Sequence, residues 1–446
     1  MKCYDIAIVG AGPGGYTAGI QAANLGFTVV IIEGGDIGGT CLNKGCIPSK
    51  TFLKYVKDLD QWNSNTLSSK NSNYNHSLDQ IMVKKSKVIS SLRNGIQTWL
   101  SENKVELLQG KAIVQTNNRI KILSNGNYQE LKAEHIILAN GSRPNIPDIP
   151  GLDKINYYTS DTIFELEELP SSIVIFGGGA IGLEIATTFH NIGLDVYVVE
   201  VGDRILPSED KAASDYLYRS MVEQGIHVYT SAEVIDCSEG GILSIKYDGQ
   251  IFSIDAEAVM VATGRIPNTS GIESLPIEYD AGFVKVNESM ETSIPSYYAI
   301  GDLIGGYQLS HAAMIEATNA IQHISGKAVN KKSLIPRCIF TSPEVASIGK
   351  TEEQAIHSGY DIITTKVDLG SQNNKGFMKT IANKKDEKVL GVVMVGPYVT
   401  EMISQPASLL ELEGRVEELG CTVFPKPAIS KLIREGNQVY QERFIL

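Results

Sequence analysis

The pattern of apolar and polar positions predicts the same unit twice in this chain. Residues 5–33 read DIAIVGAGPGGYTAGIQAANLGFTVVIIE, an apolar strand, a glycine turn, a helical stretch and a second strand that ends in Glu33. Residues 172–200 read SIVIFGGGAIGLEIATTFHNIGLDVYVVE and follow the same plan as far as Glu200. The closing acid follows the first glycine by 23 residues in both copies. We therefore expect two β-α-β units with parallel strands.

Further apolar runs predict the rest of the architecture. Residues 136–144, 259–268 and 296–306 each run from a strand into glycines, and we expect these junctions to close on the two units. The last 110 or so residues predict strands followed by helices in an α+β layer. A polar, Asn- and Ser-rich stretch at 62–77 predicts a surface loop between two helices.

The glycines of the two turns have distinct tasks in a dinucleotide fingerprint. The first glycine allows the tight turn, the second lets the backbone approach a pyrophosphate, and the third lets helix and strand pack closely. The phosphates then lie at a helix N-terminus, where free N–H groups favour anions. The alternative is a pair of plain strand-turn-helix units, but both copies also carry the flanking elements and the acid. The glycines in question are Gly10, Gly12 and Gly15 in the first copy and Gly177, Gly179 and Gly182 in the second.

The closing acids predict which nucleotide each unit prefers. Glu33 and Glu200 are placed to accept hydrogen bonds from a ribose diol. A carboxylate at Glu200 would repel a 2'-phosphate, so NAD is favoured over NADP at the second unit.

Length and charge exclude several classes of function. A chain of 446 residues is too long for one core, and we expect about three domains. The formal charge of -12 argues against nucleic acid as a partner. We see no secretory signal and no apolar run long enough to span a membrane, so we expect a cytoplasmic protein without a membrane partner. In that compartment a close cysteine pair is catalytic or metal-binding more often than structural.

Such a pair occurs in GGTCLNKGCIPSK at 38–50, where Cys41 and Cys46 are five positions apart. On a regular helix their side chains would be too far apart and too misaligned for a disulfide. We expect the helix to be distorted between them, because Gly45 and Pro48 supply backbone freedom and a break. We favour a redox pair; a metal site or two incidental thiols are the alternatives, and no second cysteine pair lies near for zinc.

With these motifs the chain resembles the pyridine nucleotide-disulfide oxidoreductases, and the dihydrolipoamide dehydrogenases most closely among them. The resemblance rests on the GAGPGG turn with Glu33, GGTCLNKGCIPSK, GGGAIGLE with Glu200, ATGRIPN and AIGD at Asp302, and it extends from about Tyr4 to the C-terminus. It implies an α/β fold of two Rossmann-like dinucleotide-binding domains and a C-terminal α+β dimerisation domain. The implied division is 1–145 and 269–334 for the FAD-binding and central parts, 146–268 for the NAD-binding domain and 335–446 for the dimerisation domain.

The resemblance also implies cofactors and roles. FAD would occupy the first unit and NAD(H) the second, in a homodimer whose active site is shared between subunits. Cys46 would be the thiolate beside the flavin, and Cys41 the interchange thiol that meets the substrate. Lys50, one helical turn beyond Cys46, would pair with Glu184 beside the reactive flavin nitrogen. Further contacts implied by the family motifs are Gly39, Thr40, Gly141 and Asp302 for FAD, with Asp302 on the ribitol, and Gly264 for NAD.

The chain departs from the family at its C-terminus. Dihydrolipoamide dehydrogenases carry a His-Pro there, followed four residues later by a Glu that orients the histidine for proton transfer. In CTVFPKPAISKLIREG the histidine position holds Lys426 and the glutamate position Lys431, and the last histidine of the chain is His357. A lysine has a pKa of about 10.4 and is a base at neutral pH only if burial or nearby cations depress it strongly. We therefore expect poor turnover of dihydrolipoamide.

The two lysines do not identify the substrate by themselves. Near the interchange thiol they would hold Cys41 as thiolate and attract an anionic substrate. The alternative is that both point to solvent. We expect an FAD- and NAD(H)-dependent oxidoreductase that acts on a specialised, small or carrier-bound sulfur substrate. The rivals are a flavoenzyme that uses the Cys41 thiolate for thioether cleavage or carbanion chemistry, as in the 2-ketopropyl-coenzyme M oxidoreductase/carboxylases, and a non-catalytic relative that keeps FAD as a core element.

Overall fold

The computed structural model describes residues 1–65, 74–238, 240–329, 334–369, 376–424, 428, 430, 431, 433 and 434. The chain forms two compact units, and each unit is assembled from segments that are distant in sequence. The first unit comprises Met1–Ile146, Tyr158–Leu169 and Gly264–Lys332, and the second comprises Pro147–Tyr157, Pro170–Thr263 and Ser333–Leu446.

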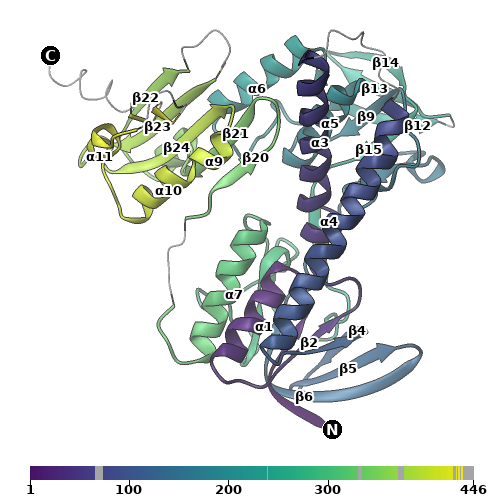
Figure 1. The fold of residues 1–446 in the computed structure, drawn as a ribbon, viewed down its shortest axis with the longest axis vertical. Coiled ribbons are helices and arrows are strands. Elements are labelled where there is room, and N and C mark those ends of the chain that lie inside the picture. The colour runs from purple at the N-terminus through teal and green to yellow at the C-terminus, as the bar shows by residue number, and fades with distance from the viewer. Residues whose placement is uncertain are drawn as a thin grey trace. The chain divides into compact units, whose positions relative to one another are not determined.

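A seven-stranded sheet forms the centre of the first unit. Its order is β3-β2-β1-β6-β5-β4, and β19 pairs with β6. Figure 1 labels β2, β4, β5 and β6 of this sheet. The β1, β2, β3, β6 and β19 strands run parallel, whereas β5 is antiparallel to both of its neighbours. The strands are β1 (Lys2–Val9), β2 (Val29–Glu33), β3 (Glu106–Gln109), β4 (Lys111–Gln115), β5 (Arg119–Ser124), β6 (Asn127–Leu138) and β19 (Tyr297–Ala299).

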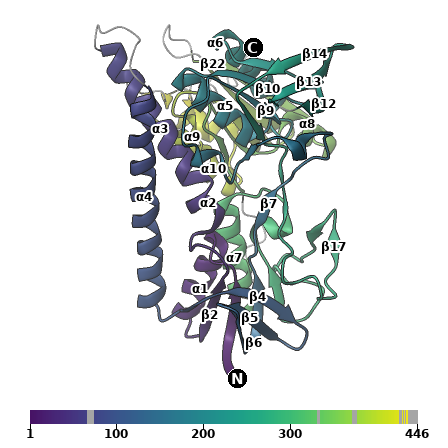
Figure 2. The ribbon, with the colours of Figure 1, turned by 90° about the vertical axis from the view of Figure 1, so that its right-hand side faces the viewer.

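Helices cover one face of this sheet. Because side chains alternate between the faces of a strand, Ile6 and Ile8 of β1 pack with residues of α1, α4 and α7, whereas Ala7 and Val9 pack in a second cluster on the other face. The helices α1 and α7 lie side by side in both views (Figures 1 and 2). The helices are α1 (Pro13–Asn24), α2 (Gly39–Asn43), α3 (Cys46–Asn65), α4 (Tyr74–Glu102) and α7 (Ser310–Ile324).

The polar stretch at 62–77 is shorter as a connection than the sequence predicted. The helix α3 continues to Asn65 and α4 begins at Tyr74, so both helices extend into it. Residues 66–73 lie outside the described part of the chain. Short elements complete the first unit: β7 (Ser142–Pro144), which pairs antiparallel with β16 (Arg265–Pro267), β8 (Tyr158–Thr159), β17 (Tyr279–Asp280), β18 (Phe283–Val284), and the 3-10 turns η2 (Ile163–Glu165) and η3 (Gly301–Ile304).

The second predicted β-α-β unit lies in the second compact unit. The strands β11, β10, β9 and β15 pair side by side, all parallel, and a three-stranded antiparallel sheet β12-β13-β14 belongs to the same unit. The elements are the 3-10 turn η1 (Leu152–Lys154), β9 (Ser172–Phe176), α5 (Ala180–Ile192), β10 (Asp195–Val199), α6 (Lys211–Gln224), β11 (His227–Tyr229), β12 (Glu233–Ser238), β13 (Ile242–Tyr247), β14 (Gln250–Asp255) and β15 (Ala258–Val261).

The C-terminal part of the second unit is the expected α+β layer. Its five strands form an antiparallel sheet of order β20-β21-β24-β23-β22, and α9, α10 and α11 follow the last strand (Figure 1). The elements are β20 (Arg337–Ile339), β21 (Glu344–Gly349), α8 (Glu352–His357), β22 (Ile362–Asp368), β23 (Phe377–Asn383), β24 (Val389–Gly396), α9 (Val399–Met402), α10 (Ser404–Glu411) and α11 (Val416–Cys421).

Candidate active site

Each β-α-β unit holds its closing acid in the same way. The backbone N–H groups of Ala11 and Gly35 donate to the two carboxylate oxygens of Glu33, at 2.6 Å each. Glu200 accepts the same two bonds from the matching residues of the second turn, also at 2.6 Å each. These bonds fix each carboxylate at the edge of its glycine turn. A carboxylate has about four lone-pair sites, so two acceptor positions are left for ribose hydroxyls.

The outer glycines of each turn are required by close backbone contacts. Gly10 and Gly177 have φ of +105° and +112°, and a Cβ on either would lie 2.3 or 2.4 Å from the carbonyl oxygen of the residue that follows the neighbouring strand, Ala139 or Ala262. A Cβ on Gly15 or Gly182 would lie 1.9 or 2.2 Å from the carbonyl oxygen of the first glycine. Both contacts are shorter than any side chain allows, so the tight turn and the close helix packing depend on glycine.

The middle glycines face open space. A Cβ on Gly179 would meet no protein atom within 4 Å, and a Cβ on Gly12 would meet only the Cα of Gly39, at 3.9 Å. Helices α1 and α5 begin directly after these glycines, at Pro13 and Ala180. A bare backbone in front of a helix N-terminus suits a pyrophosphate, so both turns fit the dinucleotides that the sequence predicted.

The loop before Cys41 touches the first glycine turn. The N–H of Gly38 donates to the carbonyl of Ala11 at 2.9 Å, and a Cβ on Gly39 would lie 2.8 Å from the Cα of Gly12. Thr40 follows in α2, half-buried, and its carbonyl accepts the N–H of Lys44 at 2.9 Å. The predicted nucleotide contacts Gly39 and Thr40 therefore lie beside the pyrophosphate turn.

Asp302 lies in η3, within the same unit. Its carboxylate accepts the hydroxyl of Ser142 at 2.5 Å, and the guanidinium of Arg265 donates to that hydroxyl oxygen at 2.8 Å. Gly141 precedes Ser142 with φ of +72° and open space in the Cβ direction. Near η3 the Nε2 of Gln308 is buried without a hydrogen-bond partner in the described structure, as expected of a group that faces a polar ligand. These residues fit the ribitol and ring of a flavin.

Gly264 is assigned to a different compact unit from the predicted NAD contacts Gly177, Gly179 and Gly182. It belongs to the first unit, whereas those three glycines belong to the second. Its carbonyl accepts the N–H of Asn145 at 3.0 Å, and its φ is +100°. A role for Gly264 in NAD binding stays a prediction.

The cysteine motif has the predicted helix distortion. Helix α2 ends at Asn43 and α3 begins at Cys46, so the backbone leaves the helical path between the two cysteines. A Cβ on Gly45 would lie 3.2 Å from the carbonyl oxygen of Thr40. The break brings the two thiols, both reduced here, into hydrogen-bonding contact, which a regular helix would not allow.

The surroundings of Cys41 favour its thiolate. The hydrogen bond with Cys46 lowers the pKa of Cys41 to about 7, burial acts against this shift, and a hydrogen bond with Ser310 and the charge of Lys50 add to it. The charge of Lys50 therefore reaches Cys41, whereas the expected pairing of Lys50 with Glu184 stays a prediction. A thiol with this pKa is about half ionised at neutral pH and is a ready nucleophile.

Two neighbours of the pair were missed in the sequence. Burial raises the pKa of Tyr16, and the negative charges of Cys41 and Cys46 raise it further, which places this α1 side chain close to both sulfurs. Ser310, the first residue of α7, is 269 positions beyond Cys41 and no pattern connects the two in the sequence. Tyr16 directly follows the glycine turn, and its position there was the only available signal.

Arg93 of α4 holds α2, the short helix that contains Cys41, through Asn43. Its Nε donates to the side-chain oxygen of Asn43 at 2.6 Å, and it forms an ion pair with Asp36 at 2.7 Å. The amide of Asn43 in turn donates to the carbonyls of Ile37 and Gly39 at 3.0 and 2.9 Å. This network joins α2 to the loop that leads from Glu33.

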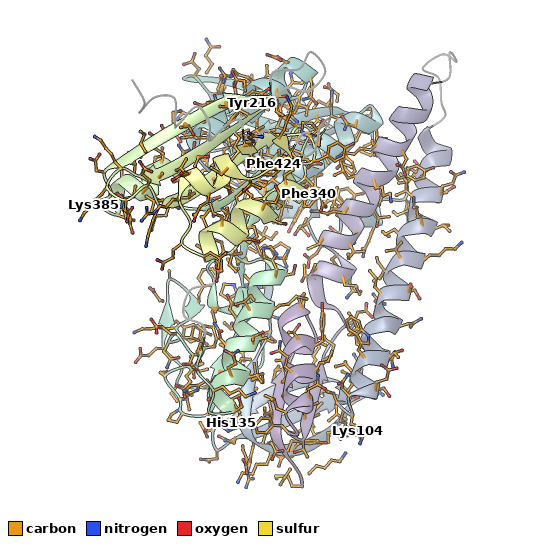
Figure 3. All side chains as sticks on the ribbon, turned by 60° about the vertical axis from the view of Figure 1, so that its left-hand side comes forward. Lys104, His135, Tyr216, Phe340, Lys385 and Phe424 are labelled. Carbon is orange, nitrogen blue, oxygen red and sulfur yellow. The ribbon has the colours of Figure 1, made fainter. Side chains whose placement is uncertain are left out.

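The remaining predicted residues lie in the second unit or outside the described chain. The carboxylate of Glu184 on α5 accepts the backbone N–H of Phe340 at 3.0 Å, and Phe340 is labelled in Figure 3. Lys431 lies exposed in a short helical turn. Lys426 is outside the described residues.

Within the described residues, no cluster of three or more His, Cys, Asp or Glu side chains could hold a metal ion. No helix in the described part of the chain is long and apolar enough to cross a membrane.

Comparisons with known proteins agree with this arrangement. The family "Pyridine nucleotide-disulphide oxidoreductase" matches residues 4–317, and the dimerisation domain of the same family matches residues 335–436. A dihydrolipoyl dehydrogenase of Bacillus subtilis is 35% identical, with 97% of each chain covered. The structure of LpdA from Mycobacterium tuberculosis matches with a TM-score of 0.87 at 25% identity, covering 99% of this chain and 100% of that one.

A further solved structure is that of RclA from Escherichia coli, described as an HOCl-induced flavoprotein disulfide reductase. It matches with a TM-score of 0.85 at 25% identity, covering 98% of this chain and 100% of that one. The match to the dimerisation domain supports a homodimer. The family matches do not favour the thioether-cleaving or non-catalytic alternatives. The chain belongs to the pyridine nucleotide-disulphide oxidoreductases and is an FAD- and NAD(H)-dependent enzyme of the dihydrolipoyl dehydrogenase type.

Proposed function

We propose that this enzyme reduces a specialised disulfide with electrons from NADH, through FAD and the Cys41–Cys46 pair. The observation that carries this proposal is the setting of Cys41, whose thiolate is stabilised by Cys46, Ser310 and Lys50, all within the first unit. A thiolate with a pKa near ambient pH is well suited to attack a disulfide.

The chemistry balances without a resident base. Bound FAD would supply hydride transfer from NADH, and the Cys41–Cys46 disulfide would receive the electron pair and be reduced to a thiol and a thiolate. The Cys41 thiolate then attacks one sulfur of the substrate disulfide, which releases a thiolate that takes a proton from water. The Cys46 thiolate next attacks Cys41 in the mixed disulfide, which re-forms the Cys41–Cys46 bond and releases the second thiolate. One NADH and one proton are consumed for each disulfide reduced to two thiols.

Further roles belong to the same proposal. Lys50 and Glu184 form the pair beside the reactive flavin nitrogen, and the C-terminal segment of the partner subunit closes the active site. The domain division 1–145, 146–268, 269–334 and 335–446 is proposed with it. The proposed nucleotide contacts are Gly10, Gly12, Gly15, Glu33, Gly39, Thr40, Gly141 and Asp302 for FAD, and Gly177, Gly179, Gly182, Glu200 and Gly264 for NAD(H).

The C-terminal segment defines the substrate class that we propose. With Lys426 and Lys431 at the His and Glu positions, a substrate whose thiols need a proton taken or given by the enzyme is disfavoured. A substrate that releases acidic thiols, or that carries a carboxylate for the two lysines, is favoured. We also propose that the enzyme works in the cytoplasm, where NADH is at hand and a reducible pair is useful.

An anaerobic titration of the purified holoenzyme with NADH tests the redox pair. We expect a long-wavelength charge-transfer band, because a thiolate beside the flavin produces one, and this band should be absent in Cys46→Ser. A FAD-containing wild-type protein that shows no such band would remove the disulfide function. Assays with lipoamide, a glutathione-type disulfide and a carboxylated aromatic disulfide then rank the substrates; faster turnover of lipoamide than of the others would contradict the proposed class.

A further inference from the structure

The guanidinium of Arg265 joins two other segments of the first unit. Its Nε and Nη2 donate to the hydroxyl and the carbonyl of Ser142, at 2.8 and 2.9 Å. Its Nη1 donates to Oδ1 of Asp161 and to the hydroxyl of Ser160, at 2.8 Å each. The side chains of Arg265 and Asp161 are 9% and 21% exposed. A poorly hydrated guanidinium with all three nitrogens bonded keeps one orientation, because its planar fork fits one arrangement of acceptors.

The orientation of Arg265 determines where the Ser142 hydroxyl points. The hydroxyl oxygen accepts from Arg265, so its one hydrogen is left for Asp302, whose carboxylate accepts it at 2.5 Å. The backbones of Arg265 and Ser142 lie on the paired antiparallel strands β16 and β7. A series of bonded groups therefore runs from Asp161 through Arg265 and Ser142 and ends on Asp302, the acid expected at the flavin ribitol.

The segment that carries Asp161 also packs on the helix that carries Cys46. Phe164, three residues beyond Asp161, has its ring centroid 5.1 Å from that of Phe52 in α3. These two residues are 6% and 0% exposed, and the carbonyl of Phe164 accepts Nζ of Lys85 in α4 at 2.5 Å. Helix α3 begins at Cys46. Residues 158–169 therefore connect the cysteine helix to the arginine that orients the flavin acid, and all of these groups belong to the first unit.

The second carboxylate oxygen of Asp161 faces the cysteine loop. This Oδ2 lies 3.9 Å from Nζ of Lys44, which stands between Cys41 and Cys46 in the sequence. The Lys44 side chain is 50% exposed, so its ion pair with Asp161 contributes little free energy. The bond to Arg265 is therefore the stronger of the two ties that Asp161 makes.

We propose that Asp161 is a positioning residue that holds Asp302 at a fixed place relative to the helix that carries Cys46. Asp161 acts through Arg265 and Ser142, and its place in the segment 158–169 relates the flavin acid to the cysteine helix. The inference rests on the proposed function, because it takes Asp302 as a flavin contact and Cys46 as the thiolate beside the flavin. Reacting groups have to be held within a fraction of an ångström of their working geometry, which such a connection provides.

The rate of FAD release from the dimeric holoenzyme tests this series without turnover. Free FAD collected by ultrafiltration at set times after dilution gives the rate. Asp161→Asn keeps the shape of the side chain and removes the charge that orients Arg265, and it should speed FAD release about tenfold. Lys44→Met is the matched control, because it removes the other partner of the same carboxylate, and it should stay within about twofold of the wild type. A Lys44→Met rate as fast as that of Asp161→Asn would assign the effect to Lys44 and refute the proposal.

A double-mutant cycle separates this role from a general loss of stability. In a Ser142→Ala background the series is already broken, so Asp161→Asn should speed FAD release there by less than about twofold. A merely structural role of Asp161 would speed release by the same factor in both backgrounds, and that outcome would overturn the proposal. Arg265→Lys keeps the charge and loses the planar fork. Measured in the same two backgrounds, it should behave as Asp161→Asn does, so the test stands even if Asp161→Asn fails to fold.

The long-wavelength band of the reduced holoenzyme gives a second readout. Asp161→Asn with full FAD content should show a weaker band per bound FAD, because the flavin is no longer held against the Cys46 thiolate. An unchanged band would contradict the link to the cysteine helix. If NADH produces no band in the wild type, the proposed function fails, and the double-mutant cycle still decides whether Asp161 positions Asp302. If the band appears and the two backgrounds give equal factors, only the role of Asp161 fails.

Discussion

The Nζ of Lys379 lies 2.7 and 2.8 Å from the two carboxylate oxygens of Asp210. Both side chains are buried, with 9% and 1% of their surface exposed. Asp210 caps α6 through the N–H of Ala212, and Lys379 projects from β23, so the pair joins the nucleotide-binding and C-terminal parts of the second unit. A buried pair of this kind leaves an uncompensated charge when either partner is removed.

We predict that Lys379→Met destabilises the second unit by about 3–5 kcal/mol, because Asp210 would remain buried without its cation. The thermal unfolding midpoint should fall by several degrees. Lys384→Met, one residue beyond the end of β23, is the matched control, since the ion pair of Lys384 with Asp361 spans 3.6 Å between exposed side chains. We expect the control to change stability by less than about 0.5 kcal/mol. Equal midpoints for the two variants would contradict the prediction.

His135 should make the first unit less stable in mild acid. Its side chain, labelled in Figure 3, has an Nδ1 without a hydrogen-bond partner in the described structure. Burial lowers the pKa of His135. The carboxylates of Glu134, Asp5 and Glu291 partly offset this decrease, and the charge of His323 adds to it.

The folded protein therefore favours neutral His135. Its contribution to stability is fully present above the unfolded pKa of about 6.5 and is lost as the pH falls through the lower folded pKa. Unfolding midpoints measured from pH 7.5 to 5 should decline in the wild type and decline less in His135→Gln. Parallel curves for the two proteins would show that the decline has another origin.

Replacing both C-terminal lysines with the family's His and Glu should increase the turnover of lipoamide. We predict that Lys426→His combined with Lys431→Glu increases NADH-driven lipoamide turnover by up to about 10²-fold, since general acid-base catalysis is worth about 10²- to 10⁴-fold. Lys426→Gln removes the charge without adding a base and should show no such gain. A wild-type rate already equal to that of the double variant would refute the loss of the proton relay.

Two glycines of the second turn, the outer Gly182 and the middle Gly179, should separate effects on folding from effects on binding. Gly182→Ala places a methyl group 2.2 Å from the carbonyl oxygen of Gly177, so it should lower the thermal midpoint strongly. Gly179→Ala meets no protein atom within 4 Å and should leave the midpoint unchanged. Its methyl group would face the pyrophosphate, and NADH affinity should fall by at least about tenfold. A Gly179→Ala protein with wild-type NADH affinity would show that the nucleotide does not bind at this turn.

The sequence patterns predicted those parts of the fold that depend on residues close together in the chain. The two β-α-β units and the break beside Gly45 each follow from strand, turn and helix preferences within about thirty residues. Contacts between distant segments could not be found in that way. Ser310 meets Cys41 only because α7 packs on α1, and Lys379 meets Asp210 only because β23 and the start of α6 come together in the fold.

The length of the two helices around 62–77 was also beyond local rules. The polar composition there indicated a loop, yet α3 continues to Asn65, since helices also accept polar residues. Polarity reports exposure, and it distinguishes poorly between a loop and a solvated helix.

The groups that lower the pKa of Cys41 in the described structure, namely Cys46, Lys50 and Ser310, belong to one compact unit. The C-terminal segment with its two lysines belongs to the other. Under the proposed function, the residues that tune the nucleophile and the residues that select the electron acceptor therefore belong to different parts of the chain. Mutations in the C-terminal segment could change which disulfide the enzyme reduces, while the first unit still reduced the cysteine pair and kept the pKa of Cys41.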